Sequence, residues 1–151
     1  MFHFIARQKP VSAQVKNAKR LQDYKRRLSE LARAAGVTLA AGEVYVRLLW
    51  FHSVPLTRED PDIDNILKPV LDALQGSAFS DDGVVARCTA ARHDTSRQDL
   101  VLAQPDGREH PATSEIAALL LAADAEHILY VEVGKTSGQA VVLGPVDGVH
   151  A

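Results

Sequence analysis

Residues 60–76 read DPDIDNILKPVLDALQG, an aspartate-rich loop followed by a short helix. The apolar residues of this stretch recur at helical spacing, which places them on one buried face: Ile66, Val70, Leu71 and Leu74. Pro69 lacks a backbone N–H and is tolerated in the first turn of a helix, so the helix cap falls near Asn65 or Ile66. We therefore predict a helix over about residues 65–75.

The flanking sequence predicts an α+β fold with a mixed β-sheet flanked by helices. In residues 43–52, apolar side chains at every second position face one way and Tyr45 and Arg47 face the other, which is typical of a strand. This strand becomes apolar on both sides near its end, which favours a central position in the sheet. A basic helix is predicted from residue 12 or 13 to residue 35. The remaining predicted elements are strands at 2–7, 84–93, 128–133 and 140–143 and a short helix from 113 or 114 to 123.

A length of 151 residues fits a single domain, 1–151. Within it, we expect residues 94–127 to form a longer irregular and helical insertion and residues 134–151 to form a tail that frays. The composition, 46% hydrophobic and 24% charged, excludes disorder throughout the chain.

The sequence shows no membrane or secretory segment. No apolar run approaches the roughly 18 residues that span a bilayer, and the first residues lack the pattern of a secretory signal. We therefore expect a cytoplasmic protein with no membrane partner. Cys88 is the single cysteine, which excludes an internal disulfide and a cysteine-built zinc site within one chain.

Charge is distributed unevenly along the chain. Residues 1–35 contain nine Lys or Arg residues against two acidic residues, a net charge of +7, which leaves −9 for the remainder because the total is −2. A basic segment followed by an acidic remainder is typical of a phosphate-backbone binder with a carboxylate metal site. From charge alone, a solvated helix face is the favoured interpretation.

Five aspartates flank the predicted helix 65–75, Asp60, Asp62 and Asp64 before it and Asp81 and Asp82 after it. Asp62 and Asp64 are two positions apart in an extended loop and can point to the same place. Asp81 and Asp82 follow the helix and come close to the first pair if the next strand starts near the helix N-terminus. Carboxylate oxygens are the ligands that Mg²⁺ or Mn²⁺ prefers.

Lys68 lies one helical turn beyond Asp64, and Asp72 lies one turn further on the same stripe. A metal with a lysine beside it forms a site that can hydrolyse a phosphodiester, because both cations offset negative charge as it develops. The structural alternative is a helix cap, an i,i+4 ion pair and a turn. This alternative leaves the clustering of the aspartates unexplained, since their mutual repulsion is costly without a cation.

The stretch from Asp62 to Gly76, followed by Asp81 and Asp82 and a valine-rich strand, resembles the signature of the RusA family of Holliday junction resolvases. It joins a D-x-D-N, a K-P, a D-A-L and a D-D at the spacing of that family. Weaker similarity includes residues 10–14 and Tyr24-Lys25, so the resemblance covers roughly residues 2–93 and the closing strand.

The resemblance implies a dimeric RusA-like fold and a Mg²⁺-dependent endonuclease that nicks four-way junction DNA at symmetric positions in recombination and repair. The catalytic residues of the family match Asp62, Asp64, Asp82 and Lys68. The implied metal ligands are Asp62, Asp64 and Asp82, with Asp81 as an additional ligand. A homodimer suits this task, because two symmetric nicks require two sites related by a two-fold axis. The expected DNA-binding residues are Lys16, Lys19, Arg20, Lys25, Arg26, Arg27 and Arg92.

The chain departs from the family pattern at Gly83, at Arg92 and in the length of residues 94–127. These departures concern DNA contacts more than the metal site. Two other functions remain open at this point: a branched-DNA-binding protein without catalysis, and a metal-dependent phosphohydrolase that acts on small nucleotides.

Overall fold

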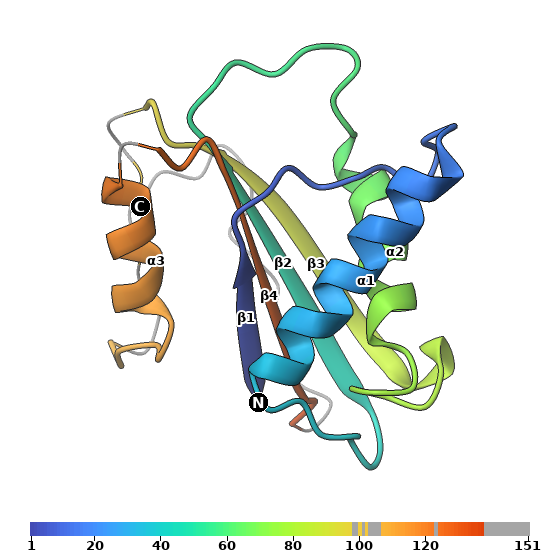
Figure 1. Cartoon of the computed structure of the whole chain (residues 1–151). Helices are drawn as coiled ribbons and strands as arrows, with labels where there is room; N and C mark the ends of the chain where they lie inside the picture. The colour runs from blue at the N-terminus through green and yellow to red at the C-terminus, as the bar shows by residue number, and fades with distance from the viewer. Residues whose placement is uncertain (98–99, 101, 103–106, 123, 138–151) are drawn as a thin grey trace, which may run out of the picture.

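In the described residues, four strands form one mixed sheet in the order β1-β4-β2-β3. The computed structural model describes residues 1–97, 100, 102, 107–122 and 124–137 (Figure 1). β4 (His127–Lys135) lies between β1 (Phe2–Ala6) and β2 (Val44–His52) and is antiparallel to both. β3 (Val85–Asp94) is parallel to β2. The α+β class with a mixed sheet is confirmed.

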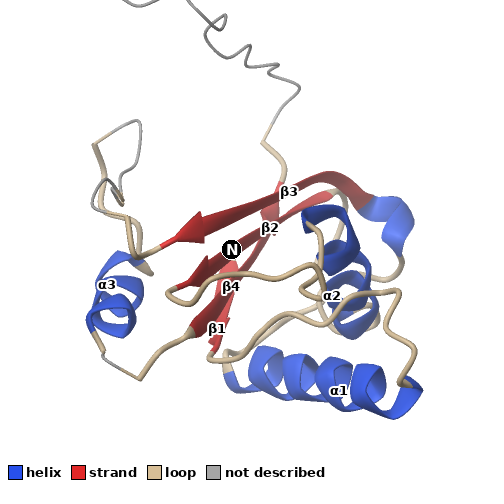
Figure 2. Ribbon diagram, turned by 90° about the horizontal axis from the view of Figure 1, so that it is seen from above, coloured by secondary structure: helices blue, strands red, loops and turns tan. Residues whose placement is uncertain are grey.

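Helices lie on both faces of the sheet. α1 (Ala18–Ala34) and α2 (Leu67–Leu74) are on one face and α3 (Thr113–Leu121) is on the other (Figures 1 and 2). The short 3-10 helices η1 (Ile63–Ile66) and η2 (Asp82–Val84) precede and follow α2. Parallel strands need a crossover connection, and here the crossover from β2 to β3 carries Asp62 and Asp64 before α2 and Asp81 and Asp82 after it.

Apolar side chains cover both faces of the sheet at its centre. Val46, Leu48 and Trp50 of β2 are fully buried on the face of α1 and α2. Phe51 packs with Ile116 of α3 on the opposite face. The predicted central position of residues 43–52 is therefore correct. Burial on both faces explains why residues 48–51 are all apolar.

The predicted start of the first helix, at residue 12 or 13, is wrong. α1 begins at Ala18, and the Asn17 side chain caps it by accepting a hydrogen bond of 3.0 Å from the backbone N–H of Arg20. Ser12 instead accepts from the backbone N–H of Gln14 at 3.0 Å, a local turn that competes with helix formation. Two residues of capping type precede the helix, and the second one starts it.

The helix predicted over residues 65–75 is shorter in the structure. α2 has Ile66 as its N-cap, as Pro69 requires, and ends at Leu74. Gly76 follows with φ of +84°, a conformation that favours glycine. Residues 63–66 form η1, a single 3-10 turn that continues directly into α2.

The C-terminal part agrees with the sequence in outline. α3 lies within the predicted helix, and β4 extends beyond residues 128–133 at both ends. The predicted strand at 140–143 and most of the predicted tail lie outside the described residues. No helix in the described part of the chain is both long and apolar enough to cross a membrane.

Candidate functional site

The aspartates of the crossover lie on two segments that contact the same edge of the sheet. Asp62 and Asp64 belong to the start of η1, and Asp81 and Asp82 immediately precede β3. η1 contacts β3, and Ile63 packs against the same core as Val84. β3 therefore contacts the segment that precedes α2, and the meeting of the two aspartate pairs stays a prediction.

Lys68 of α2 connects this edge to the helix layer. Its Nζ lies 2.7 Å from Asp72 Oδ1 and 2.9 Å from Asp82 Oδ2. Lys25 of α1 donates to the second oxygen of Asp72 at 2.9 Å. A continuous chain of alternating charge therefore runs from α1 through α2 to the turn before β3.

The electrostatics at the centre of this chain of charges favour the charged forms of Asp72 and Lys68. Burial alone would raise the pKa of the Asp72 carboxyl, but hydrogen bonds from Lys68 and Lys25 outweigh it, so that the pKa lies below its usual value. Hydrogen bonds to Asp72 and then to Asp82 raise the pKa of Lys68 above its ordinary value. Lys68 is therefore a fixed positive charge at neutral pH and a poor proton donor.

Asp82 has one oxygen without a partner. Its Oδ2 accepts from Lys68, whereas Oδ1 is buried and forms no hydrogen bond with any of the residues that the structure describes. A buried, unpartnered carboxylate oxygen is costly and calls for an explanation. Hard oxygen ligands of this kind suit a divalent cation such as Mg²⁺, so the chemistry of the site fits a metal.

Asp62, Asp64 and Asp81 lie on the surface. Asp62 and Asp64 are exposed, and their carboxylates form no hydrogen bond or ion pair within the described residues. Asp81 Oδ1 accepts from the backbone N–H of Gly83 at 2.7 Å and thereby caps η2. A Cβ atom at position 83 would lie 2.7 Å from that same oxygen, which gives a local reason for the glycine.

The structure does not assemble the complete predicted ligand set. Within the residues that are described, no three His, Cys, Asp or Glu side chains are grouped so that they could hold a metal ion. Lys68 and Asp82 form an ion pair, and Asp81 is the residue before Asp82. Asp62 and Asp64 belong to the neighbouring segment around η1. Convergence of Asp62, Asp64 and Asp82 on one metal remains a prediction.

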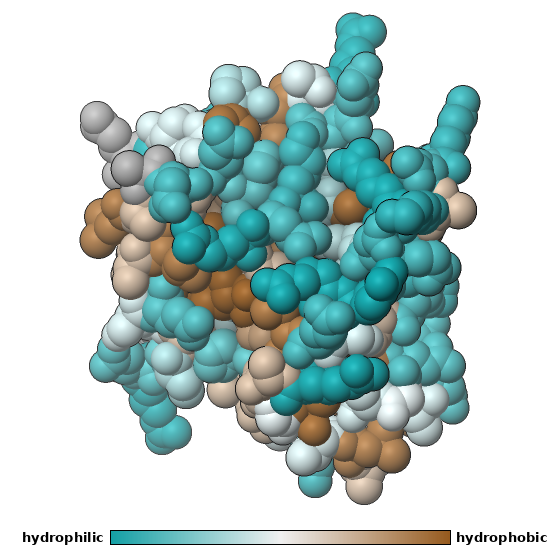
Figure 3. All heavy atoms as spheres, viewed as in Figure 1, coloured by the Kyte–Doolittle hydropathy of each residue, from teal (hydrophilic) through white to brown (hydrophobic). Residues whose placement is uncertain are grey.

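The predicted DNA-binding residues divide into two groups. Lys19 and Arg26 both pair with Asp23, Lys25 pairs with Asp72, and Arg92 lies with its guanidinium 6.0 Å from the centroid of the Trp50 ring. The remaining three are exposed and have no ion pair among the described residues: Lys16, Arg20 and Arg27. Polar side chains cover α1 on the side of the molecule drawn in Figure 3.

A polar groove of about 390 Å³ is lined in part by Asp62 and Asn65. Its walls are residues 9–15 and 57–62, together with Arg20. The groove is held in shape by an ion pair of 2.6 Å between Lys9 and the buried carboxylate of Asp60 and by a hydrogen bond of 2.9 Å from Ala13 N to Asn65 O. Arg58, which also lines the groove, was not identified from the sequence, because an arginine in a loop without a motif gives no signal by itself.

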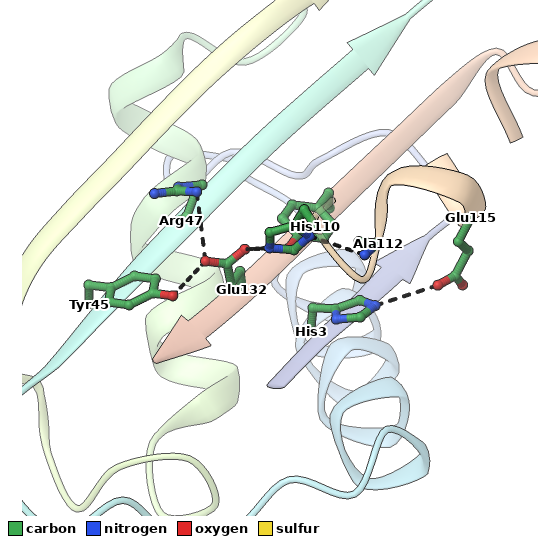
Figure 4. Close-up of polar contacts among 8 residues, drawn as sticks. His3, Tyr45, Arg47, His110, Ala112, Glu115 and Glu132 are labelled. Carbon is green, nitrogen blue, oxygen red and sulfur yellow. Dashed lines mark hydrogen bonds and ion pairs between the residues drawn. The ribbon is translucent and has the colours of Figure 1, made fainter. Parts of the chain in front are cut away.

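A second polar cluster lies on the α3 face of the sheet (Figure 4). Glu132 of β4 is 2% exposed, and its carboxylate accepts from Tyr45 at 2.6 Å and from Tyr130. His110 Nε2 lies 2.8 Å from the same carboxylate and Arg47 lies 3.7 Å away. Gly134 leaves room for Tyr45, whose ring atoms would lie 2.5 Å from a Cβ atom there. These contacts tie the segment before α3 to the sheet.

Glu132→Ala should lower the free energy of unfolding by at least about 2 kcal/mol, because it leaves two tyrosine hydroxyls without their acceptor. Hydrogen bonds and the charge of Arg47 outweigh burial and lower the pKa of Glu132 in the folded state, so this stabilisation is present above pH 4.5 and is lost as the pH falls through the folded pKa. Urea denaturation of Glu132→Ala and of the exposed control Glu126→Ala at pH 7 and pH 3 measures both effects. Equal stability of the two variants at pH 7 would contradict the prediction.

A lysine ammonium held between carboxylates, with further unpaired aspartates on the adjoining segment, is a side-chain set typical of enzymes that hydrolyse phosphodiesters. A comparison with protein families identifies which family of such enzymes the chain resembles. The model of the family Endodeoxyribonuclease RusA matches residues 5–102, and the chain belongs to this family. The resemblance drawn from the sequence is thereby confirmed. A comparison with curated proteins finds no match.

Proposed function

We propose that the protein is a Mg²⁺-dependent endonuclease that resolves four-way DNA junctions by paired symmetric nicks and acts as a homodimer. One observation carries the proposal: in a chain of the RusA family, Lys68 contacts Asp82, whose second oxygen is buried and has no partner in the described part of the chain. Catalysis of phosphodiester hydrolysis needs cations at the scissile phosphate, and the lysine and the unpartnered oxygen supply one cation and a ligand for another.

In this proposal Asp62, Asp64 and Asp82 hold Mg²⁺, or Mn²⁺ in its place, and Asp81 is an additional ligand. The bound metal would polarise the scissile phosphate and lower the pKa of a water molecule. Asp62 and Asp64 have exposed carboxylates with no hydrogen bonds to break, so they are free to turn toward Asp82. Lys68 contributes positive charge at the phosphate, and its raised pKa argues against a role in proton transfer.

DNA binding is assigned to Lys16 before α1, to Arg20 and Arg27 of α1 and to Arg58 of the groove. The first three are exposed, and Arg20 also borders the groove, which Asp62 helps to line. Such contacts position the backbone without reading the sequence. A four-way junction has approximate two-fold symmetry, so two identical sites in a dimer can cut two strands at equivalent places.

Arg58→Gln should weaken junction binding and lower the slope of log Kd against log salt concentration by about one, because one phosphate contact is lost. Binding to a labelled junction in EDTA over a series of salt concentrations measures the slope. Arg33→Gln, at the C-terminal end of α1, is the control and should keep the slope of the unmodified protein. A slope unchanged in Arg58→Gln would remove Arg58 from the interface.

The proposed function is tested by incubating the purified protein with a four-way junction, a linear duplex and a single strand of the same sequence, each with Mg²⁺, Mn²⁺ or EDTA. Nicks at symmetric positions in the junction, dependent on the metal, are expected. Binding without nicking in any metal would favour the non-catalytic DNA-binding function. Equal hydrolysis of small nucleotides would favour the phosphohydrolase. Sedimentation analysis tests the homodimer.

A further inference from the structure

Lys25 is positioned to support the active site rather than to bind DNA. Its side chain is 22% exposed and the side chain of Asp72 is 28% exposed, so the pair lies partly buried between α1 and α2. Each oxygen of Asp72 has its own cation, Oδ2 with Lys25 and Oδ1 with Lys68. The carboxylate is therefore fixed from two sides, which also fixes the direction in which it holds Lys68.

The ion pair between Lys25 and Asp72 is not needed merely to hold the two helices together. α1 and α2 already pack through the buried side chains of Leu28 and Val70. A hydrogen bond of 2.7 Å from Ser29 Oγ to Ala73 O also joins the helices, one helical turn after Lys25 on α1 and one residue after Asp72 on α2. The ion pair is therefore one of several contacts between the helices, and it is the one that contains the partner of Lys68.

We propose that Asp72 and Lys25 are positioning residues, which hold the ammonium of Lys68 beside Asp82 for the reaction. This inference rests on the proposed function. It gives Lys25 a different role from the phosphate contact expected from the sequence, and the two roles have different kinetic consequences. Loss of a phosphate contact weakens binding, whereas loss of a positioning residue lowers the rate of the bound complex.

The kinetic experiment measures Kd in EDTA and single-turnover nicking of the junction with saturating protein in Mg²⁺. Lys25→Met should lower the nicking rate about 10-fold with Kd changed less than about two-fold, since supporting residues of this kind commonly contribute 10- to 100-fold. Lys25→Arg, which keeps the charge, should recover most of the rate. Asp72→Asn should lower the rate at least as much as Lys25→Met. Ser29→Ala removes the neighbouring helix contact and should keep the rate of the unmodified protein.

A second measurement does not depend on nicking activity. Lysines are acylated with a trace of acetic anhydride, and labelling of Lys68 is compared with that of Lys135 by mass spectrometry. Asp72→Asn should increase labelling of Lys68 several-fold, because it removes a carboxylate that holds the ammonium, and Ser29→Ala should not.

The proposal is overturned if Lys25→Met weakens binding without slowing the bound complex, if Ser29→Ala slows nicking equally, or if labelling of Lys68 stays unchanged in Asp72→Asn. Absence of junction nicking by the unmodified protein would refute the proposed function, while the labelling experiment would still decide whether Asp72 holds Lys68.

Discussion

Asp64→Asn is expected to reduce junction nicking by about 10³-fold or more while junction binding is retained or becomes tighter. The substitution keeps the size of the side chain but removes a negatively charged metal ligand from the proposed set, and metal coordination contributes several kcal/mol to phosphodiester hydrolysis. Removal of a negative charge from a surface that faces phosphates does not weaken binding. The exposed position of Asp64, without any hydrogen bond in the described residues, means that the folded structure loses no contact.

The measurement is single-turnover nicking of a labelled junction in Mg²⁺, with binding followed in EDTA. Asp124→Asn is a matched control, because Asp124 is an exposed aspartate that pairs with Arg7 and does not belong to the crossover. The control should nick normally. Nicking by Asp64→Asn at the rate of the control would refute the catalytic role of Asp64.

Lys68→Met should lower the single-turnover rate by about 10²–10³-fold, comparable to the loss of one charge-stabilising donor in other active sites. The side chain keeps its length and its apolar stem, so the change isolates the ammonium that contacts Asp72 and Asp82. Because the pKa of Lys68 is raised, its charge is constant over the accessible pH range. The ratio of the single-turnover rate of the unmodified protein to that of Lys68→Met should therefore be the same at pH 6.5 and pH 8.5.

Lys135→Met serves as the control for this variant, since Lys135 is an exposed lysine at the end of β4. If the ratio of the rates of the unmodified protein and Lys68→Met changes steeply between the two pH values, Lys68 transfers a proton. A rate equal to that of the control would exclude any catalytic role.

Local patterns were sufficient to predict most of the fold. The spacing of apolar residues together with Pro69 located α2 and its cap, and the alternation in residues 43–52 identified a central strand. These predictions succeeded because helix and strand periods are properties of neighbouring residues. The start of α1 was predicted too early because Ser12 and Asn17 both have the chemistry of a helix cap, and the choice between them depends on how the preceding segment packs against η1.

Contacts between distant segments could not be predicted in the same way. The pair of Lys68 and Asp72 follows from their spacing on one helix, whereas the contact of Lys25 with Asp72 depends on the packing of α1 on α2. The cluster around Glu132 depends on the register of β2 with β4, which places Arg47 opposite Glu132, and on the burial of this face by α3. A glutamate in an alternating strand is ordinarily read as exposed.

The position of β4 has a consequence for the synthesis of the protein. The strand that is made last among those described inserts between the first and the second, so β1 has no partner until residue 135 has left the ribosome. The nascent chain can form only the β2 and β3 pair beforehand, and long-range closure of this kind is slow. A shortened chain that stops at residue 102, where the family match ends, would lack the strand that joins the two halves of the sheet. A minimal folding unit must therefore extend through Lys135.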